Sequence, residues 1–348
     1  MRRISRITVA GAATASLALA LSACGGTSTE GSSDSKGDKG LAIAYDVGGK
    51  GDQSFNDAAY AGLEQAKKEF KYETADIEPT EGETDADKQQ RLESLAKQGY
   101  NPVVGVGYAY ASAVKGAAEK FPDTTFGIVD DATIEADNVA DLVFSEEEAS
   151  YLAGVAAAKS TETKTVGFVG GVNIPLIHKF RAGFEQGVKD TDPSVKVISQ
   201  FLTQTADEGG FSSPHMGKTA AEGQIERKAD VVYAAAGLSG QGVIEAAAAN
   251  EVWAIGVDSD QYQQEALAKY KDSILTSAMK DVAKAVYNLA KSVEDGKPET
   301  GIVRGDLKTG EVSLSNSNPK FADNAELQEA ITAAKEKITS GEIKVKSS

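Results

Sequence analysis

Residues 41–57 read Leu-Ala-Ile-Ala-Tyr-Asp-Val-Gly-Gly-Lys-Gly-Asp-Gln-Ser-Phe-Asn-Asp. A short apolar run opens this stretch, a glycine-rich loop follows, and an amphipathic segment then continues to Phe70. Apolar runs of this length are typical of buried parallel strands. Ser54 is a favourable residue for a helix N-cap, and Asp57 three residues later strengthens that signal. The stretch therefore predicts a strand, a loop and a helix, which together form the repeating unit of α/β folds.

The same alternation of apolar and amphipathic stretches continues along the chain. The apolar runs predict buried strands at residues 41–45, 102–106, 125–129, 139–144, 165–169, 195–201, 231–235, 253–257 and 274–277. The amphipathic stretches predict helices at residues 54–70, 86–98, 111–120, 145–159, 176–189, 239–250, 281–294 and 325–338. This number of strands exceeds the usual size of one compact sheet. We therefore expect an α/β protein with two doubly wound, mainly parallel sheets.

The predicted elements divide into two lobes. The Ala-rich helix at 145–159 is expected to cross from the first lobe to the second, and the chain is expected to return near residue 280. The resulting boundaries are 41–144 plus 280–348 for lobe 1 and 145–279 for lobe 2. Residues 301–315 have the pattern of a β-hairpin.

The N-terminus combines the features of an export signal. Three arginines precede an uncharged apolar stretch at 7–21, which is shorter than the roughly 20 residues that span a bilayer. The following Leu-Ser-Ala-Cys ends at Cys24 and resembles the lipobox of bacterial lipoproteins. We expect residues 1–23 to be a signal peptide, Cys24 to carry a diacylglycerol thioether, and the Gly/Ser-rich residues 24–40 to be a flexible tether. The protein would then be lipid-anchored on the extracytoplasmic face of the cell membrane.

Charge and composition exclude several classes of partner. The net charge of −16 becomes −19 once residues 1–23, with three arginines and no acid, are removed. A chain this acidic is a poor partner for nucleic acid. Cys24 is the one cysteine, and neither His178 nor His215 belongs to a cluster with the spacing of metal ligands. We therefore expect no bound metal, cofactor or nucleic acid.

Three predicted strands run directly into an aspartate, at Asp46, Asp130 and Asp258. Because ligands of open α/β sheets bind beyond the carboxyl ends of the strands, these acids could converge on one cleft between the lobes. The alternative is that each aspartate caps the helix that follows it. Phe55, at the first helical position, could stack on a flat ligand ring or pack into the core as a hydrophobic staple.

Residues 46–56, ending in Ser-Phe-Asn, resemble the opening motif of the basic membrane protein (BMP) family of substrate-binding lipoproteins. The resemblance continues along nearly the whole mature chain, through motifs at residues 126–130, 151–157, 166–171, 181–184, 229–237, 253–261 and 276–280. It implies a type I periplasmic-binding-protein fold, in which two lobes joined by hinge crossovers close on a ligand. It also implies an ABC importer whose permease and ATPase subunits are the partners, and a purine nucleoside as ligand. We expect a monomeric binding protein and not an enzyme.

Carried over residue by residue, the resemblance implies a ligand-binding set of Asp46, Phe55, Asn56, Asp130, Gly237, Gly240, Asp258 and Lys280. Phe55 would stack on the base, and Asn56 with the two aspartates of lobe 1 would pair with its polar edge. Asp258 would hold the ribose hydroxyls, with Lys280 beside it. The two glycines would let the backbone approach the ligand closely.

One stretch departs from the family pattern. Residues 202–217 are longer than the family usually has, and a second stacking aromatic is expected from lobe 2 at Phe201, Phe211 or Tyr233. This departure leaves open another ligand on the same scaffold, such as a flavin, a sugar or a signalling molecule. A third hypothesis is a secreted hydrolase that uses a carboxylate pair at the strand ends.

Overall fold

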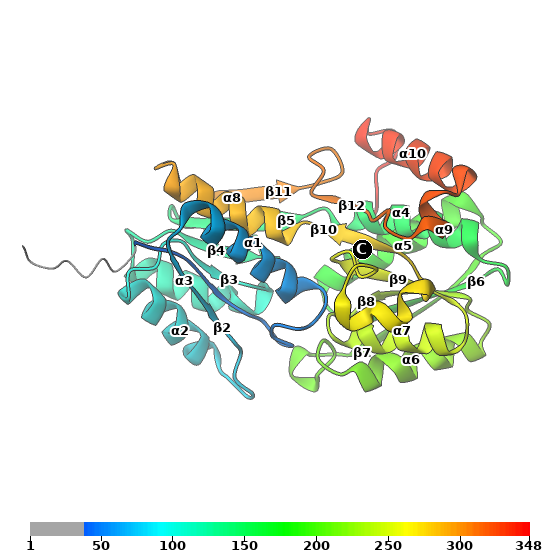
Figure 1. Ribbon diagram of the computed structural model, residues 1–348, viewed down its shortest axis with the longest axis horizontal. Coiled ribbons are helices and arrows are strands. Elements are labelled where there is room, and N and C mark those ends of the chain that lie inside the picture. The colour runs from blue at the N-terminus through cyan, green and yellow to red at the C-terminus, as the bar shows by residue number, and fades with distance from the viewer. Residues whose placement is uncertain (1–37) are drawn as a thin grey trace, which may run out of the picture. The chain divides into compact units, whose positions relative to one another are not determined.

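Two six-stranded sheets organise residues 38–348, which are the residues that this computed structural model describes (Figure 1). The first sheet has the order β11-β5-β4-β3-β1-β2. Its strands are β1 (Lys39–Ala44), β2 (Glu73–Ile77), β3 (Val103–Gly105), β4 (Phe126–Val129), β5 (Val139–Phe144) and β11 (Gly301–Gly305). The second sheet has the order β12-β10-β9-β8-β6-β7. Its strands are β6 (Thr165–Val172), β7 (Lys196–Thr203), β8 (Val231–Ala235), β9 (Trp253–Asp258), β10 (Ile274–Lys280) and β12 (Val312–Leu314).

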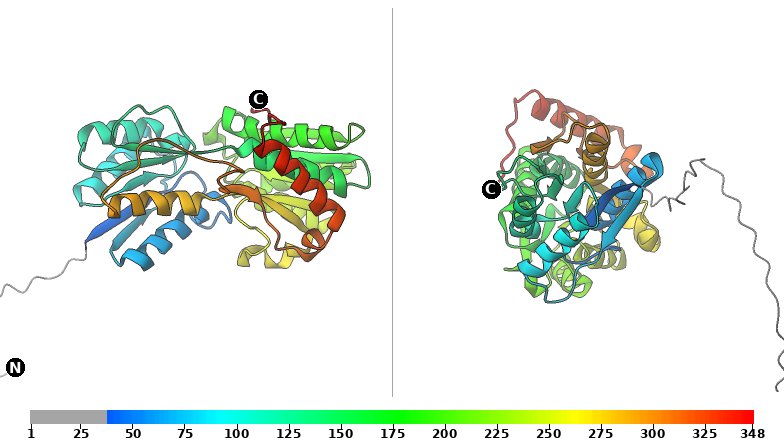
Figure 2. Two further views of the ribbon diagram at one scale, coloured as in Figure 1. Left: turned by 90° about the horizontal axis from the view of Figure 1, so that it is seen from above. Right: turned by 90° about the vertical axis from the view of Figure 1, so that its left-hand side faces the viewer.

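Helices cover both faces of each sheet, as Figure 2 shows. The first sheet with its helices is lobe 1, and it contains α1 (Phe55–Phe70), α2 (Asp85–Lys97), α3 (Ala111–Lys120) and α8 (Val282–Glu294). The second sheet with its helices is lobe 2, and it contains α4 (Glu146–Ser160), α5 (Pro175–Thr191), α6 (Pro214–Glu226), α7 (Ser239–Ala249), α9 (Pro319–Ala322) and α10 (Ala325–Thr339). Except for the antiparallel pair of β10 and β12, the pairings are parallel. The predicted doubly wound α/β class is confirmed.

Every strand and helix predicted from the alternating pattern overlaps an observed element. The predicted signal peptide, Cys24 and most of the predicted tether lie outside the described residues. Within 38–348, no helix combines the length and apolarity that a membrane span needs.

The chain passes between the lobes three times, and the third passage corrects the sequence prediction. The first two passages lie between β5 and α4 and between β10 and α8, as expected. The predicted hairpin at 301–315 is wrong, because β11 pairs with β5 in lobe 1 and β12 pairs with β10 in lobe 2. A turn does form at Asp306–Gly310, but each flanking strand pairs with the edge of a different sheet.

The assignment of the whole C-terminal part to lobe 1 is wrong for the same reason. β12 extends the second sheet, and α10 packs against α4. Only α8 and β11 of the chain after residue 280 belong to lobe 1, where α8 packs on α1. The apolar face of α10 therefore covers lobe 2, which local patterning could not reveal.

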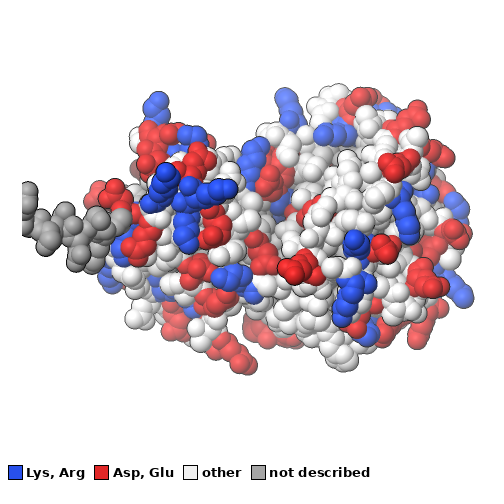
Figure 3. All heavy atoms as spheres, viewed as in Figure 1, with Lys and Arg blue, Asp and Glu red and all other residues white. Residues whose placement is uncertain are grey.

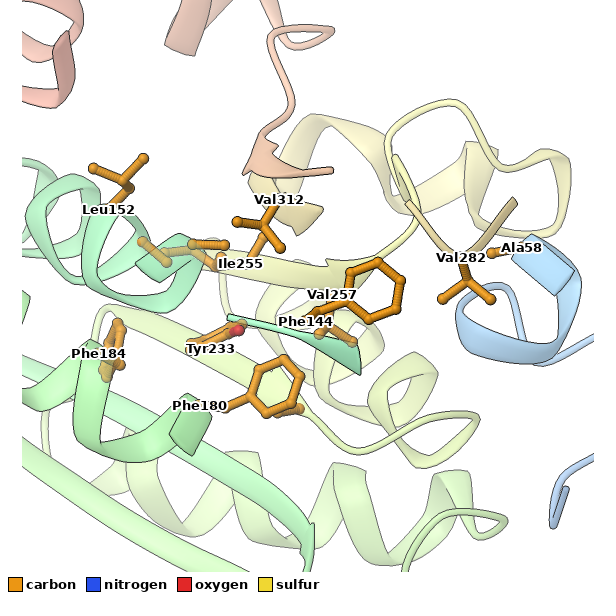
Figure 4. Close-up of a cluster of buried hydrophobic side chains, with 14 of the residues drawn as sticks. Ala58, Phe144, Leu152, Phe180, Phe184, Tyr233, Ile255, Val257, Val282 and Val312 are labelled. Carbon is orange, nitrogen blue, oxygen red and sulfur yellow. The ribbon is translucent and has the colours of Figure 1, made fainter. Parts of the chain in front are cut away.

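The largest group of buried apolar side chains is continuous across the two lobes. Figure 4 shows part of it, with Phe144 and Val282 from lobe 1 and Phe180 and Val257 from lobe 2. α4 is buried on nearly all sides, as expected for an Ala-rich helix without a polar face. Packed apolar side chains therefore surround the passages between the lobes.

Candidate ligand-binding cleft

The carboxyl ends of strands from both sheets meet at a cleft between the lobes. The space between these residues that no atom fills is about 540 Å³, with the open mouth of the cleft included. Lobe 1 lines it with Asp46, Val47, Asp52, Phe55, Asn56, Tyr108 and Asp130. Lobe 2 lines it with Leu176, Ile177, Phe180, Phe211, Ala235, Ala236, Gly237, Val257, Asp258 and Lys280.

The structure brings together all the predicted ligand-binding residues except Gly240. Gly240 lies in the first turn of α7, where it is buried and where an added Cβ would meet Ala234 at 3.6 Å. The sequence motif placed two glycines near the cleft, but the start of α7 turns the second one into lobe 2. Gly237 lines the cleft with a left-handed φ of 53°.

Asp52 fixes the loop that leads into α1, and sequence reasoning missed it. Its two carboxylate oxygens accept the backbone N–H groups of Ser54, Asn56 and Asp57 at 2.8–3.1 Å. Asp52 thereby satisfies the free donors at the start of α1, which is the role predicted for Ser54. The Ser54 side chain makes no capping bond and instead donates to Asp258 of lobe 2 at 2.7 Å.

Asp46 is held where β1 ends. Its backbone N–H donates to Asn56 Oδ1 at 3.2 Å, and its own Oδ1 accepts the Val47 N–H at 2.7 Å. Burial raises the pKa of this carboxyl from 3.8 to about 7. Gly107 passes directly over it with a φ of +103°, and a Cβ at that position would lie 2.0 Å from Asp46 Oδ2. Only glycine allows this close approach.

A buried lysine connects the aspartates of the two lobes. Lys280 Nζ, at the end of β10, lies 2.6 Å from Asp130 Oδ2 and 3.6 Å from Asp258 Oδ1. Burial alone would lower the pKa of Lys280, but the neighbouring acids outweigh burial and hold that pKa above its usual value. The lysine therefore remains a cation. Its Nζ also lies 4.7 Å from the centre of the Phe55 ring and 5.5 Å from that of Phe180, within the range of cation–π contacts.

Glu146 extends this charged group to the first passage between the lobes. It is the first residue of α4, it is buried, and its Oε2 accepts from Lys179 Nζ of α5 at 3.1 Å. Burial and repulsion from Asp130 raise the pKa of Glu146 to about 7. Glu146 is one of three successive glutamates, so its sequence context did not distinguish it.

The backbone is left-handed at three non-glycine residues of this region. The φ angles are 56° at Gln53, 67° at Asp130 and 62° at Asp258. Such conformations cost free energy, on the order of 1–3 kcal/mol each, and cluster at functional sites because the surrounding structure holds them. Here they direct two of the three strand-end aspartates into the cleft.

Aromatic rings from both lobes face the cleft. Phe55 is half-buried at the first position of α1, where it lines the cleft and also packs against the core. Of the three aromatic candidates in lobe 2, Phe211 lines the cleft. Phe201 packs on Phe168, with ring centres 6.4 Å apart, and Tyr233 is buried against Ser150. Phe180 and Tyr108, which sequence reasoning did not select, also line the cleft.

The cleft offers hydrogen-bond acceptors to a ligand. Asp130 Oδ1 and Asp258 Oδ1 are buried and accept no hydrogen bond from any residue of 38–348. Buried acceptors of this kind are costly unless a donor reaches them. Across the described residues, no group of three or more His, Cys, Asp or Glu side chains is arranged to hold a metal ion. The arrangement therefore suits a flat ligand that carries N–H or O–H donors.

Comparisons with known proteins show the family of this chain. Residues 40–348 match the Bmp family model, described as ABC transporter substrate-binding protein PnrA-like. The chain is 35% identical over 359 residues to the ABC transporter nucleoside-binding protein BmpA of Lactococcus lactis, covering 98% of each chain. It is also 35% identical over 301 residues to an uncharacterized lipoprotein of Pyrococcus abyssi, covering 82% of this chain and 70% of the relative.

A solved structure shows the same fold. The ABC transporter solute-binding protein from Aeropyrum pernix superposes with a TM-score of 0.74 at 28% identity, covering 89% of this chain and 94% of that one. The predicted family and periplasmic-binding-protein fold are confirmed, and the family consists of binding proteins and not of hydrolases. The chain belongs to the Bmp family of ABC transporter substrate-binding proteins.

Proposed function

We propose that the protein captures a purine nucleoside between its lobes and presents it to the ABC importer. One observation carries this proposal: the Phe55 ring and the Lys280–Asp130–Asp258 group line the same cleft. A purine nucleoside fits both parts, because its flat base can stack on the ring and its ribose hydroxyls can donate to the carboxylates. The relative from Lactococcus lactis, named as nucleoside-binding, supports the same ligand class.

In this proposal Phe55 stacks on the base, while Asn56, Asp46 and Asp130 pair with its polar edge. Asp258 accepts from the ribose hydroxyls, and Gly237 lets the lobe 2 backbone approach. Phe211, which lines the cleft from lobe 2, supplies the second stacking surface in this proposal.

The charges of the cleft favour a neutral ligand. Four aspartates and one lysine are its charged lining residues, and the lysine is already paired with two of the aspartates. A phosphate group would meet uncompensated carboxylates, so nucleotides should bind poorly. Figure 3 shows basic and acidic side chains interspersed on the face viewed.

Closure would occur by a hinge motion at the three passages between the lobes. A ligand that touches both lobes favours the closed form, which the permease would then recognise. We further propose that Cys24 carries the lipid that anchors the protein outside the membrane; the lipoprotein name of the Pyrococcus abyssi relative supports this. Membrane fractionation tests the anchor, since Cys24→Ala protein should leave the membrane fraction and its retention there would contradict the proposal.

Isothermal titration of the protein without residues 1–37 tests the ligand. We expect a purine nucleoside to bind with a Kd of about 1 μM or lower, whereas its 5′-monophosphate and free ribose should bind far more weakly. The panel also includes pyrimidine nucleosides, riboflavin and several sugars. An absence of heat with every nucleoside would overturn the proposal, and tight binding of riboflavin or a sugar would establish the alternative ligand.

A further inference from the structure

Ser54 joins the two lobes at the edge of the cleft. It precedes Phe55, and its side chain is fully buried. Its Oγ donates to Asp258 Oδ2 at 2.7 Å, across 204 residues of sequence. Within the described chain, Ser54 is not one of the residues that line the cleft. A ligand in the cleft would therefore meet Asp258 but not Ser54.

Two more hydrogen bonds lie beside this one. Ser259 Oγ donates to the Ser54 carbonyl at 2.8 Å, and Gln261 Nε2 donates to the Gln53 carbonyl at 3.1 Å. We call these contacts of Gln53 and Ser54 with Asp258, Ser259 and Gln261 the seam. The chain alone makes every bond of the seam, so the seam needs no ligand.

The Ser54 hydrogen bond engages only one of the two carboxylate oxygens of Asp258. Oδ2 is occupied by the Ser54 hydroxyl, while Oδ1 stays without a hydrogen bond from residues 38–348 and lies 3.6 Å from Lys280 Nζ. The left-handed backbone of Asp258 fixes where the side chain starts, and Ser54 fixes its rotation. One carboxylate oxygen is thereby left for a donor in the cleft.

We propose that Ser54 is a positioning residue that couples closure of the lobes to capture of the ligand through Asp258. Closure forms the Ser54–Asp258 bond, and that bond sets Asp258 Oδ1 to accept from the ligand. A ligand that uses Asp258 then binds the closed form more tightly and favours it. This inference rests on the proposed function, in which the ligand is a nucleoside whose ribose hydroxyls reach Asp258.

The test distinguishes two roles of Ser54: orienting Asp258 for the ligand, or only joining the two lobes. Binding of a purine nucleoside and of its 2′,3′-dideoxy analogue is titrated against wild type, Ser54→Ala and Ser259→Ala. Ser259→Ala is the matched control, because it removes one serine hydroxyl and one seam bond without touching Asp258. We expect Ser54→Ala to weaken the nucleoside about tenfold and the dideoxy analogue less than twofold. Ser259→Ala should change both ligands by the same factor.

Each result then supports or overturns one step. No nucleoside binding by wild type would overturn the proposed function itself. Equal affinity of wild type for nucleoside and dideoxy analogue would overturn the contact between Asp258 and the ribose. If wild type distinguishes the two ligands but Ser54→Ala weakens them equally, Ser54 is a seam residue only and the positioning role is overturned. If thermal unfolding shows that Ser54→Ala is not folded, Ser54→Gly removes the same hydroxyl at a position that tolerates glycine.

Discussion

Replacement of Phe55 by alanine tests the stacking surface on which the proposed function depends. The ring lines the cleft at the start of α1, and Lys280 Nζ lies 4.7 Å from its centre. Stacking of a base on an aromatic side chain is worth about 1–3 kcal/mol by alanine substitution, and 1.4 kcal/mol corresponds to a factor of ten in Kd. We therefore expect Phe55→Ala to weaken binding of a purine nucleoside by about 5- to 150-fold.

The assay is titration calorimetry beside thermal unfolding, with Phe201→Ala as the matched control. Phe201 is also a half-buried phenylalanine, but it packs on Phe168 and lies 5.4 Å from the Arg181 guanidinium, away from the cleft. Its removal should lower the unfolding temperature and leave Kd within twofold of wild type. A Phe55→Ala protein with wild-type affinity would refute the stacking role, as would equal loss of affinity in the two variants.

Two further predictions concern the buried charges. Lys280→Met leaves Asp130 and Asp258 without their cation, and loss of one member of a buried ion pair costs about 3–5 kcal/mol. Urea unfolding should show a decrease of this size in the free energy of unfolding, and the double variant Lys280→Met/Asp130→Asn should recover part of it. An unchanged unfolding midpoint would contradict this prediction. Burial raises the pKa of Asp46 from 3.8 to about 7, so the folded protein holds this proton more tightly than the unfolded chain does. The stability that results is complete below about pH 4 and is lost as the pH rises through about 7. The ligand-free protein should therefore melt at a higher temperature at pH 5.5 than at pH 7.5, and Asp46→Asn should reduce that difference; a difference of the same size in the variant would contradict the assignment.

Most of the fold could be predicted from sequence because its central strands are buried on both faces. Such strands appear as continuous apolar runs, and β1, β4 and β8 lie close to where those runs predicted them. Edge strands lack this signal. β2 reads Glu-Thr-Ala-Asp-Ile and is only partly buried, so hydrophobic patterning alone did not identify it as a strand. β11 and β12 were recognised as strands, but their partners depend on sheet edges far away in sequence.

The segment 202–217 was singled out in the sequence only for its length. In the structure, β7 extends to Thr203 and α6 begins at Pro214, with Ser213 as its N-cap. Between these elements the chain carries Phe211 to the cleft. The Ser213–Pro214 start of α6 was a usable signal for this helix, which the alternating pattern did not predict.

The site residues that could be predicted from sequence are the polar side chains that directly follow a strand. Asp46, Asp130 and Asp258 were selected on that ground, and the structure places all three in the cleft. Phe180 and Glu146 had no such signal, because each stands on a helix among similar residues. Their location depends on how α4 and α5 pack against each other, which is a tertiary property.

The balance of polar contacts suggests why closure should respond to a ligand. In this structure, Asp130 Oδ1 and Asp258 Oδ1 are buried without a hydrogen bond from residues 38–348, and an unsatisfied buried acceptor costs about 1–3 kcal/mol. Lys280 Nζ, 3.6 Å from Asp258 Oδ1, offsets part of this cost. The three seam bonds contribute about 0.5–1.5 kcal/mol each in the opposite direction. The 2.6 Å ion pair of Lys280 with Asp130 also joins the two lobes. A ligand that donates to both aspartates removes the cost and keeps the seam, and it therefore shifts the equilibrium by the full value of its own bonds. A ligand that reaches only one lobe gains no such advantage. Under the proposed function, the cleft should therefore select molecules that have both a flat ring and a hydroxylated end.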